Sequence, residues 1–225
     1  MFRLLLATAT CLGLGMALVA APLPEGAVTF IDLQPKANQK LSEPFHDNKE
    51  GNHLESLPTG EQKFAGVKFK VGASMIQLGS KVVKMPDKVE GIKVNKKFAR
   101  LHLLHATGYG GGPNTEGSVG YVADDTVIGK YIIHYEDKSK ETIEIVYGKD
   151  VRDWWFTGEE KATSRSKVAW EGENEVSKAA NAKIRLYLTT WKNPKPGKKV
   201  VSIDYLSTKT TAAAPFCVAM TIEKR

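Results

Sequence analysis

Short segments in which apolar and polar residues alternate recur from residue 27 to the end of this 225-residue chain. One of them places Tyr131, Ile133 and Tyr135 at every second position, which is the period of a strand with one buried face. Similar patterns or short apolar runs occupy residues 64–71, 101–105, 128–136, 142–148, 184–189, 201–205 and 216–222. Because Gly, Pro, Asn and Asp separate these segments at short intervals, the sequence predicts an all-β fold with roughly eight to ten strands.

The connections between the segments are short, which favours a two-sheet antiparallel β-sandwich. Polar residues 137–141 join the segments 128–136 and 142–148, so this part is predicted to be a β-hairpin. The continuous apolar run at 101–105 is typical of a strand buried on both faces. Two stacked sheets of such strands form a jelly-roll arrangement.

The first 21 residues have the organisation of a secretory signal. Arg3 precedes an apolar run at 4–19, and two alanines stand before Pro22. The run is about 16 residues long, whereas a membrane span needs roughly 20. We therefore expect a secreted protein, extracellular or periplasmic, whose signal peptide is removed; an uncleaved signal-anchor is the alternative.

Helical patterns are weak, since residues 149–156 and 175–182 have room for only one or two turns each. The expected organisation is a signal peptide at 1–21, an extended N-terminal segment at 22–62 that wraps the sandwich, and the β-sandwich domain at 63–225, with residues 27–33 adding a strand.

Cysteine and charge narrow the class of protein further. Cys11 lies in the signal, so Cys217 is the one thiol expected in the mature chain and no intrachain disulfide forms. Cys217 has apolar neighbours, which predicts a buried, inert thiol. The net charge is +7, but acidic residues are interleaved with the basic ones and the densest basic cluster, 192–199, is broken by proline. This pattern argues against nucleic acid as a partner and fits weak attraction to anionic polymers or cell envelopes.

Four strings carry a resemblance to a known family: GEQKFAGV at 60–67, LHLLHA at 101–106, YGKDVRDWW at 147–155 and WKNPKP at 191–196. Together they resemble galactose-binding-like β-sandwich modules of secreted bacterial proteins, of the type attached to carbohydrate-active enzymes. The likeness spans residues 27–223 and implies a jelly roll that binds sugar or a cell surface. We expect the module to stand alone, without the catalytic domain that such modules commonly serve. The resemblance also implies that a structural calcium, where one binds, would use Asp124 or Asp125.

The segment 108–114 is the first candidate ligand site. Its consecutive glycines lose much conformational entropy on folding, which is tolerated where the backbone approaches something closely or turns sharply. Tyr109 offers a ring face to a sugar, and Asn114 offers hydrogen bonds to hydroxyl groups. A plain connection between strands is the alternative.

Trp154 and Trp155 form the second candidate. Neighbouring side chains of an extended backbone point to opposite faces, so one ring would be exposed beside Arg152 and provide an aromatic platform. If the segment turns instead, both rings cap the core, and the sequence favours this structural interpretation. Trp170 and Trp191 are interpreted as buried.

The sequence does not favour a catalytic or a metal-binding site. His102 and His105 are three residues apart on a strand, hence on opposite faces, and cannot readily share a metal. There is no G-x-S-x-G elbow and no phosphate-binding loop. The sequence predicts a non-catalytic module, without cofactor, that binds a polysaccharide, a glycan or another envelope polymer through Tyr109, Asn114, Arg152, Trp154 and Trp155. A structural or protein–protein interaction domain is the first alternative, and a β-sandwich glycan hydrolase with two facing carboxylates is the second.

Overall fold

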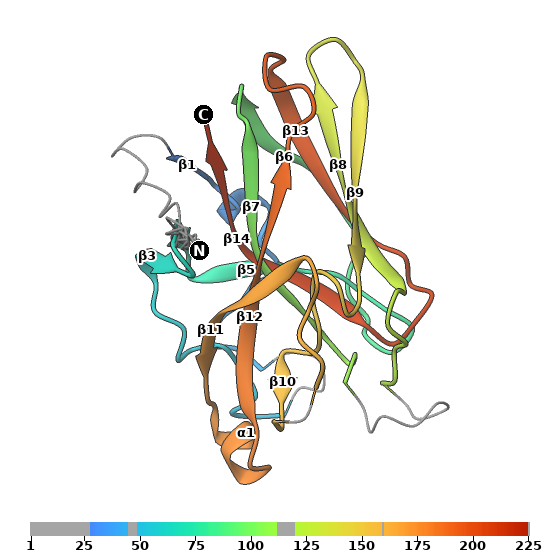
Figure 1. Cartoon of the computed structure of the whole chain (residues 1–225). Helices are drawn as coiled ribbons and strands as arrows, with labels where there is room; N and C mark the ends of the chain where they lie inside the picture. Colours follow the sequence, from blue (N-terminus) through green and yellow to red (C-terminus); the bar gives the residue numbers. More distant parts are fainter. Residues whose placement is uncertain (1–27, 45–48, 112–119, 159, 225) are drawn as a thin grey trace, which may run out of the picture.

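The computed structural model describes residues 28–44, 49–111, 120–158 and 160–224, and Figure 1 shows their arrangement. The long strands are β6 (Lys88–Lys96), β7 (Arg100–Gly108), β8 (Val127–Tyr135), β9 (Lys140–Val146), β12 (Lys183–Lys192), β13 (Val200–Ser207) and β14 (Ala214–Glu223). The shorter strands are β1 (Val28–Ile31), β2 (Gln39–Lys40), β3 (Gly60–Phe64), β4 (Val67–Val71), β5 (Ser74–Gln77), β10 (Trp155–Phe156) and β11 (Ser166–Gly172). The helices are a 3-10 turn, η1 (Gln34–Lys36), and α1 (Glu175–Ala179).

These strands pair into antiparallel sheets that pack face to face. The larger sheet has the order β10-β12-β7-β14-β5-β2, with β1 beside β14 and β11 beside β12. The smaller sheet has the order β6-β13-β8-β9, and β3 and β4 form a separate hairpin. The predicted all-β, two-sheet antiparallel sandwich is confirmed, together with the β8–β9 hairpin and the added strand near residues 27–33, which is β1.

The core lies between β7, β12 and β14 on one side and β8 and β13 on the other. Tyr131 stacks on Tyr205 with ring centroids 4.4 Å apart, and the ring of His105 lies 6.2 Å from Tyr131 across the sandwich. The β3–β4 hairpin lies against β14 on the outer face of the larger sheet, where Thr221 Oγ1 donates to the Lys68 carbonyl at 2.8 Å. The apolar run in β7 is therefore buried on both faces, as predicted.

Two local predictions are wrong. Residues 64–71 do not form one strand, because Ala65 and Gly66 have φ values of 48° and 91° and turn the chain between β3 and β4. Two positive φ values are typical of a two-residue hairpin turn. Residues 149–156 contain no helical turn; they cross the end of the sandwich and finish in β10. The other weak helical segment does hold α1, capped by Asn174.

The thiol of Cys217 is fully buried, and burial raises its pKa to about 12, as expected for an inert structural cysteine. In the described part of the chain, no helix has the length and apolar character to cross a membrane. The predicted signal peptide at 1–21 lies outside the described residues.

Candidate functional site

One end of the sandwich brings together the segments in which the sequence predicted ligand-binding residues. β7 ends there, β8 begins there and β9 ends there, opposite the β8–β9 turn (Figure 1). The chain then crosses this end between β9 and β11. We call residues 108–111, 120–126, 147–148, 151–158 and 160–161 the end site.

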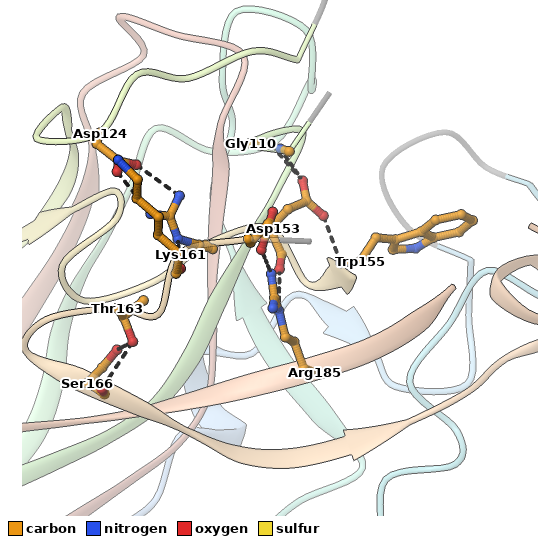
Figure 2. A network of polar contacts seen from close by, with 11 residues as sticks. Gly110, Asp124, Asp153, Trp155, Lys161, Thr163, Ser166 and Arg185 are labelled. Atoms are coloured by element: carbon orange, nitrogen blue, oxygen red, sulfur yellow. Dashed lines mark hydrogen bonds and ion pairs between the residues drawn. The ribbon is translucent and has the colours of Figure 1, made fainter. Parts of the chain in front are cut away.

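Asp153 holds two distant parts of the end site together. Its Oδ2 accepts hydrogen bonds from the backbone N–H groups of Gly110 and Gly111 at 2.6 and 3.0 Å, and its Oδ1 accepts one from Trp155 at 2.8 Å (Figure 2). Burial raises the pKa of this carboxyl to about 6, although the three backbone donors act in the opposite direction. The glycine segment is thus fixed to the tryptophan segment through one buried acid.

The glycines are required by this contact. A Cβ on Gly110 would lie 2.6 Å from Cε2 of Tyr147, and a Cβ on Gly111 would lie 2.8 Å from Cβ of Asp153. The close approach predicted from the glycine run is therefore an approach to the protein's own side chains. Tyr109 is half-buried, with φ of 53° in the left-handed region, and Asn114 lies outside the described residues.

The two tryptophan rings are in edge-to-face contact with each other, with centroids 6.3 Å apart, and both pack against the core at this end of the sandwich. Trp154 is 2% exposed, and its ring packs edge-on against Phe216 with centroids 6.3 Å apart. Trp154 is a core residue and has no free face on which a ligand could stack. Trp155 is half-buried, its indole N–H donates to Asn52 Oδ1 at 3.3 Å, and its ring points away from the polar contacts of Asp153 (Figure 2).

Arg152 is built into the end site by three hydrogen bonds. Its two terminal nitrogens each contact one carboxylate oxygen of Asp124 at 2.9 Å, and its Nε donates to the Lys161 carbonyl at 2.7 Å. The guanidinium also lies 5.5 Å from the ring centroid of Tyr147. Such a bidentate pair is held in one geometry, so Arg152 and Asp124 form a rigid polar wall.

A second buried arginine supports the opposite side of the site. Arg185 is 4% exposed, forms an ion pair with Glu160 and donates to the backbone carbonyl of Asp153 at 3.1 Å (Figure 2). Its guanidinium lies 4.2 Å from the ring centroid of Phe156, at cation–π distance. The carboxylate of Glu160 is thereby fixed at the edge of the site.

The end site contains a cavity of about 420 Å³. It is lined by Tyr121, Val122, Asp124, Tyr147, Arg152, Glu160 and Lys161. Of the binding residues predicted from the sequence, Arg152 lines this cavity, whereas Tyr109, Trp154 and Trp155 only surround or support it. The sequence analysis missed Tyr121, Tyr147, Glu160 and Lys161, because nothing in their local pattern indicates that they share one space.

The two aspartates that the resemblance implied for calcium are engaged otherwise. Asp124 is paired with Arg152, and Asp125 Oδ1 lies 2.7 Å from Nζ of Lys149. Within the described ranges, no group of three or more His, Cys, Asp or Glu side chains could hold a metal ion. These carboxylates do not fit a calcium site.

No family model, no curated protein and no solved structure matches this chain. The galactose-binding-like resemblance therefore stays a prediction, and the function has to be argued from the site.

Proposed function

We propose that this protein is a carbohydrate-binding domain and that its ligand occupies the cavity of the end site. The observation that carries the proposal is the lining of that cavity, in which a fixed carboxylate–guanidinium pair, Asp124–Arg152, faces the same space as Tyr121 and Glu160. Sugar hydroxyl groups both donate and accept hydrogen bonds, so paired anionic and cationic planar groups suit them. Aromatic rings pack against the C–H faces of a sugar.

The size and rigidity of the cavity support the same function. Its volume of about 420 Å³ falls in the range of small-molecule sites, roughly 300–1,000 Å³. Arg152 and Asp124 are already held in place in the free protein, so a ligand loses little of its binding free energy in ordering them. Lys161 is exposed and Tyr121 half-buried, and these two side chains contribute contacts that remain open to a ligand.

The proposal includes export and the absence of chemistry at this site. Residues 1–21 have the pattern of a secretory signal, which would place the domain where polysaccharides and glycans are found. Glu160 is ion-paired with Arg185 and Asp124 with Arg152, and a carboxylate held as an anion does not serve as the general acid that a glycan hydrolase needs.

A structural or protein–protein interaction domain is the second candidate. The burial of Trp154 favours it, because a sugar-binding platform needs an accessible ring. The guanidinium of Arg152 is already hydrogen-bonded to Asp124 and to a backbone carbonyl, which also favours this second candidate.

A glycan and polysaccharide array, followed by calorimetry on each ligand found, tests the proposal. We expect Lys161→Ala and Tyr121→Ala each to weaken binding by about tenfold or more, equivalent to about 1.4 kcal/mol. Lys192→Ala is the matched control, because Lys192 is exposed at the other end of β12. An absence of binding across the array by folded protein, or an equal loss with the control, would support the second candidate instead.

A further inference from the structure

Three polar side chains form a line across neighbouring strands, far along β12 from the end site. Thr190 of β12 lies directly opposite His102 of β7 in the sheet register. On the other side of β7, Thr221 of β14 is opposite His102, and Glu223 is two residues further along β14. Residues two apart on a strand share a face, so Thr190, His102 and Glu223 lie together on the outer face of the larger sheet.

The distances join these side chains into one chain of contacts. Thr190 Oγ1 lies 2.9 Å from His102 Nδ1, and His102 Nε2 lies 3.3 Å from Glu223 Oε2. Arg100 donates to the other oxygen, Glu223 Oε1, at 2.8 Å. His102 and Glu223 are 5% and 1% exposed, so their positions are fixed by packing.

The contacts also fix the proton on the imidazole ring. A carboxylate accepts hydrogen bonds only, so His102 Nε2 carries the hydrogen that Glu223 accepts. Burial lowers the pKa of His102, although Glu223 raises it, and the net shift is downward, which favours the neutral ring. In a neutral ring with hydrogen on Nε2, Nδ1 carries a lone pair, and the hydroxyl of Thr190 must donate to it.

Thr190 is open to solvent although its partners are not. It lines two neighbouring cavities of about 400 and 300 Å³, and Arg165 lines both with it. The first also contains the exposed Thr142 and the half-buried Trp191. The guanidinium of Arg165 is held in this groove by Asp150, whose Oδ1 accepts from its Nε at 3.0 Å.

A hydroxyl donating to a neutral histidine, with that histidine oriented by a carboxylate, is the arrangement of an activated nucleophile. We propose that Thr190, His102 and Glu223 form a second, hydrolytic site that acts on acyl esters bound in this groove. The site differs from the proposed carbohydrate site and does not depend on it. It departs from the expectation that the domain is non-catalytic.

In the first half of the reaction, Thr190 Oγ1 attacks the carbonyl carbon of the ester and its proton passes to His102 Nδ1. The tetrahedral oxyanion develops near the positive charge of Arg165. Collapse of this intermediate breaks the bond to the alcohol oxygen, and His102 returns the proton to the departing alkoxide. The product is an acyl ester of Thr190 and the free alcohol.

In the second half, water attacks the acyl group on Thr190 while His102 takes its proton and then returns it to the Thr190 oxygen. The free acid leaves and the starting state is restored. Glu223 is a positioning residue, because it touches only the histidine. Esters are the expected class because transfer of an acyl group between two hydroxyl oxygens exchanges leaving groups of similar basicity.

Covalent labelling tests the proposal on the intact protein. We expect a fluorophosphonate reagent to form an adduct that mass spectrometry maps to Thr190, and an aryl acetate to be hydrolysed faster than by Thr190→Val. His102→Gln should slow the labelling by about 100-fold or more. Glu223→Gln should do the same, because its amide can donate to Nε2 and thereby leave the hydrogen on Nδ1, facing Thr190.

Matched variants separate chemistry from folding. Thr190→Ser keeps the hydroxyl and should keep the labelling, and Thr142→Val removes another exposed threonine of the groove and should not change it. Replacement of the buried His102 can lower the thermal midpoint of unfolding. Thr190→Val changes only an exposed side chain, so it tests the chemistry without that effect. An absence of adduct on Thr190, or equal labelling of Glu223→Gln and wild type, overturns the proposal.

Discussion

Gly110→Ala tests how tightly the end site is assembled. The added Cβ would lie 2.6 Å from Cε2 of Tyr147 and 3.1 Å from Cγ2 of Thr107, whereas unstrained carbon atoms approach to about 3.5–4.0 Å. Relief requires the backbone to move, and that movement stretches the 2.6 Å hydrogen bond from Gly110 to Asp153. Both effects destabilise the folded state.

The expected magnitude follows from these two effects. Overpacking costs about 1–3 kcal/mol, and weakening a hydrogen bond to a charged group costs about 1.5–3 kcal/mol. Replacement of glycine by alanine also lowers the conformational entropy of the unfolded chain, which stabilises the folded state by about 0.4–1 kcal/mol. The free energy of unfolding should therefore fall by roughly 2–5 kcal/mol.

Equilibrium unfolding in urea measures this change as a lower midpoint at unchanged slope. Gly197→Ala is the matched control: an added Cβ there meets no heavy atom within 4 Å, and its effect should stay within about 0.5 kcal/mol. If Gly110→Ala unfolds at the same urea concentration as Gly197→Ala, the backbone at Gly110 is not in close contact with Tyr147 and the assembly of the end site described above is wrong.

Three further predictions concern buried groups. Asp153 has a pKa of about 6 in the folded protein, against 3.8 for an unperturbed aspartate, so the folded state binds this proton more tightly. Its contribution to stability is greatest below about pH 4 and is lost as the pH rises through 6, by up to roughly 3 kcal/mol; a titration of the Asp153 carboxyl carbon by NMR with a midpoint near 4 would contradict this. Trp154→Ala should destabilise the protein by about 3–5 kcal/mol, because it empties a core position, and Trp155→Ala should cost clearly less in the same urea experiment. Cys217 should not react with a disulfide reagent in the native state and should react fully in denaturant, since its thiol is buried with a pKa of about 12; rapid reaction of the native protein would show that β14 opens.

The sequence predicted those features that depend on neighbours along the chain. Alternation located β8, β9, β12 and β14. It missed the turn at Ala65–Gly66, although the apolar positions change there from even-numbered Phe64 to odd-numbered Val67, Phe69 and Val71. This shift of the alternation by one position is the local sign of the turn.

Features that depend on strand register could not be predicted from the sequence. The end-site cavity joins residues from three separate segments, and its Asp153 contacts join positions 42 and 43 residues apart. Thr190 and Glu223 are separated from His102 by 88 and 121 residues. They become neighbours because β7 pairs with β12 on one side and with β14 on the other. No local motif encodes that pairing.

The two proposed sites use different side chains, although one segment of the chain reaches both. Arg152 and Lys161 line the end-site cavity, whereas Asp150 and Arg165 line the groove of Thr190. Arg185 supports the end site through Glu160, and Thr190 lies five residues further along the same strand, about 16 Å away at the usual rise per residue. Substitutions separated by more than about 7–10 Å without shared partners have additive effects. Thr190→Val should therefore leave carbohydrate affinity unchanged, and Lys161→Ala should leave the labelling of Thr190 unchanged. Loss of both activities in either variant would mean that the substitution disturbs the structure that joins the two sites, and neither loss would then report on a single site.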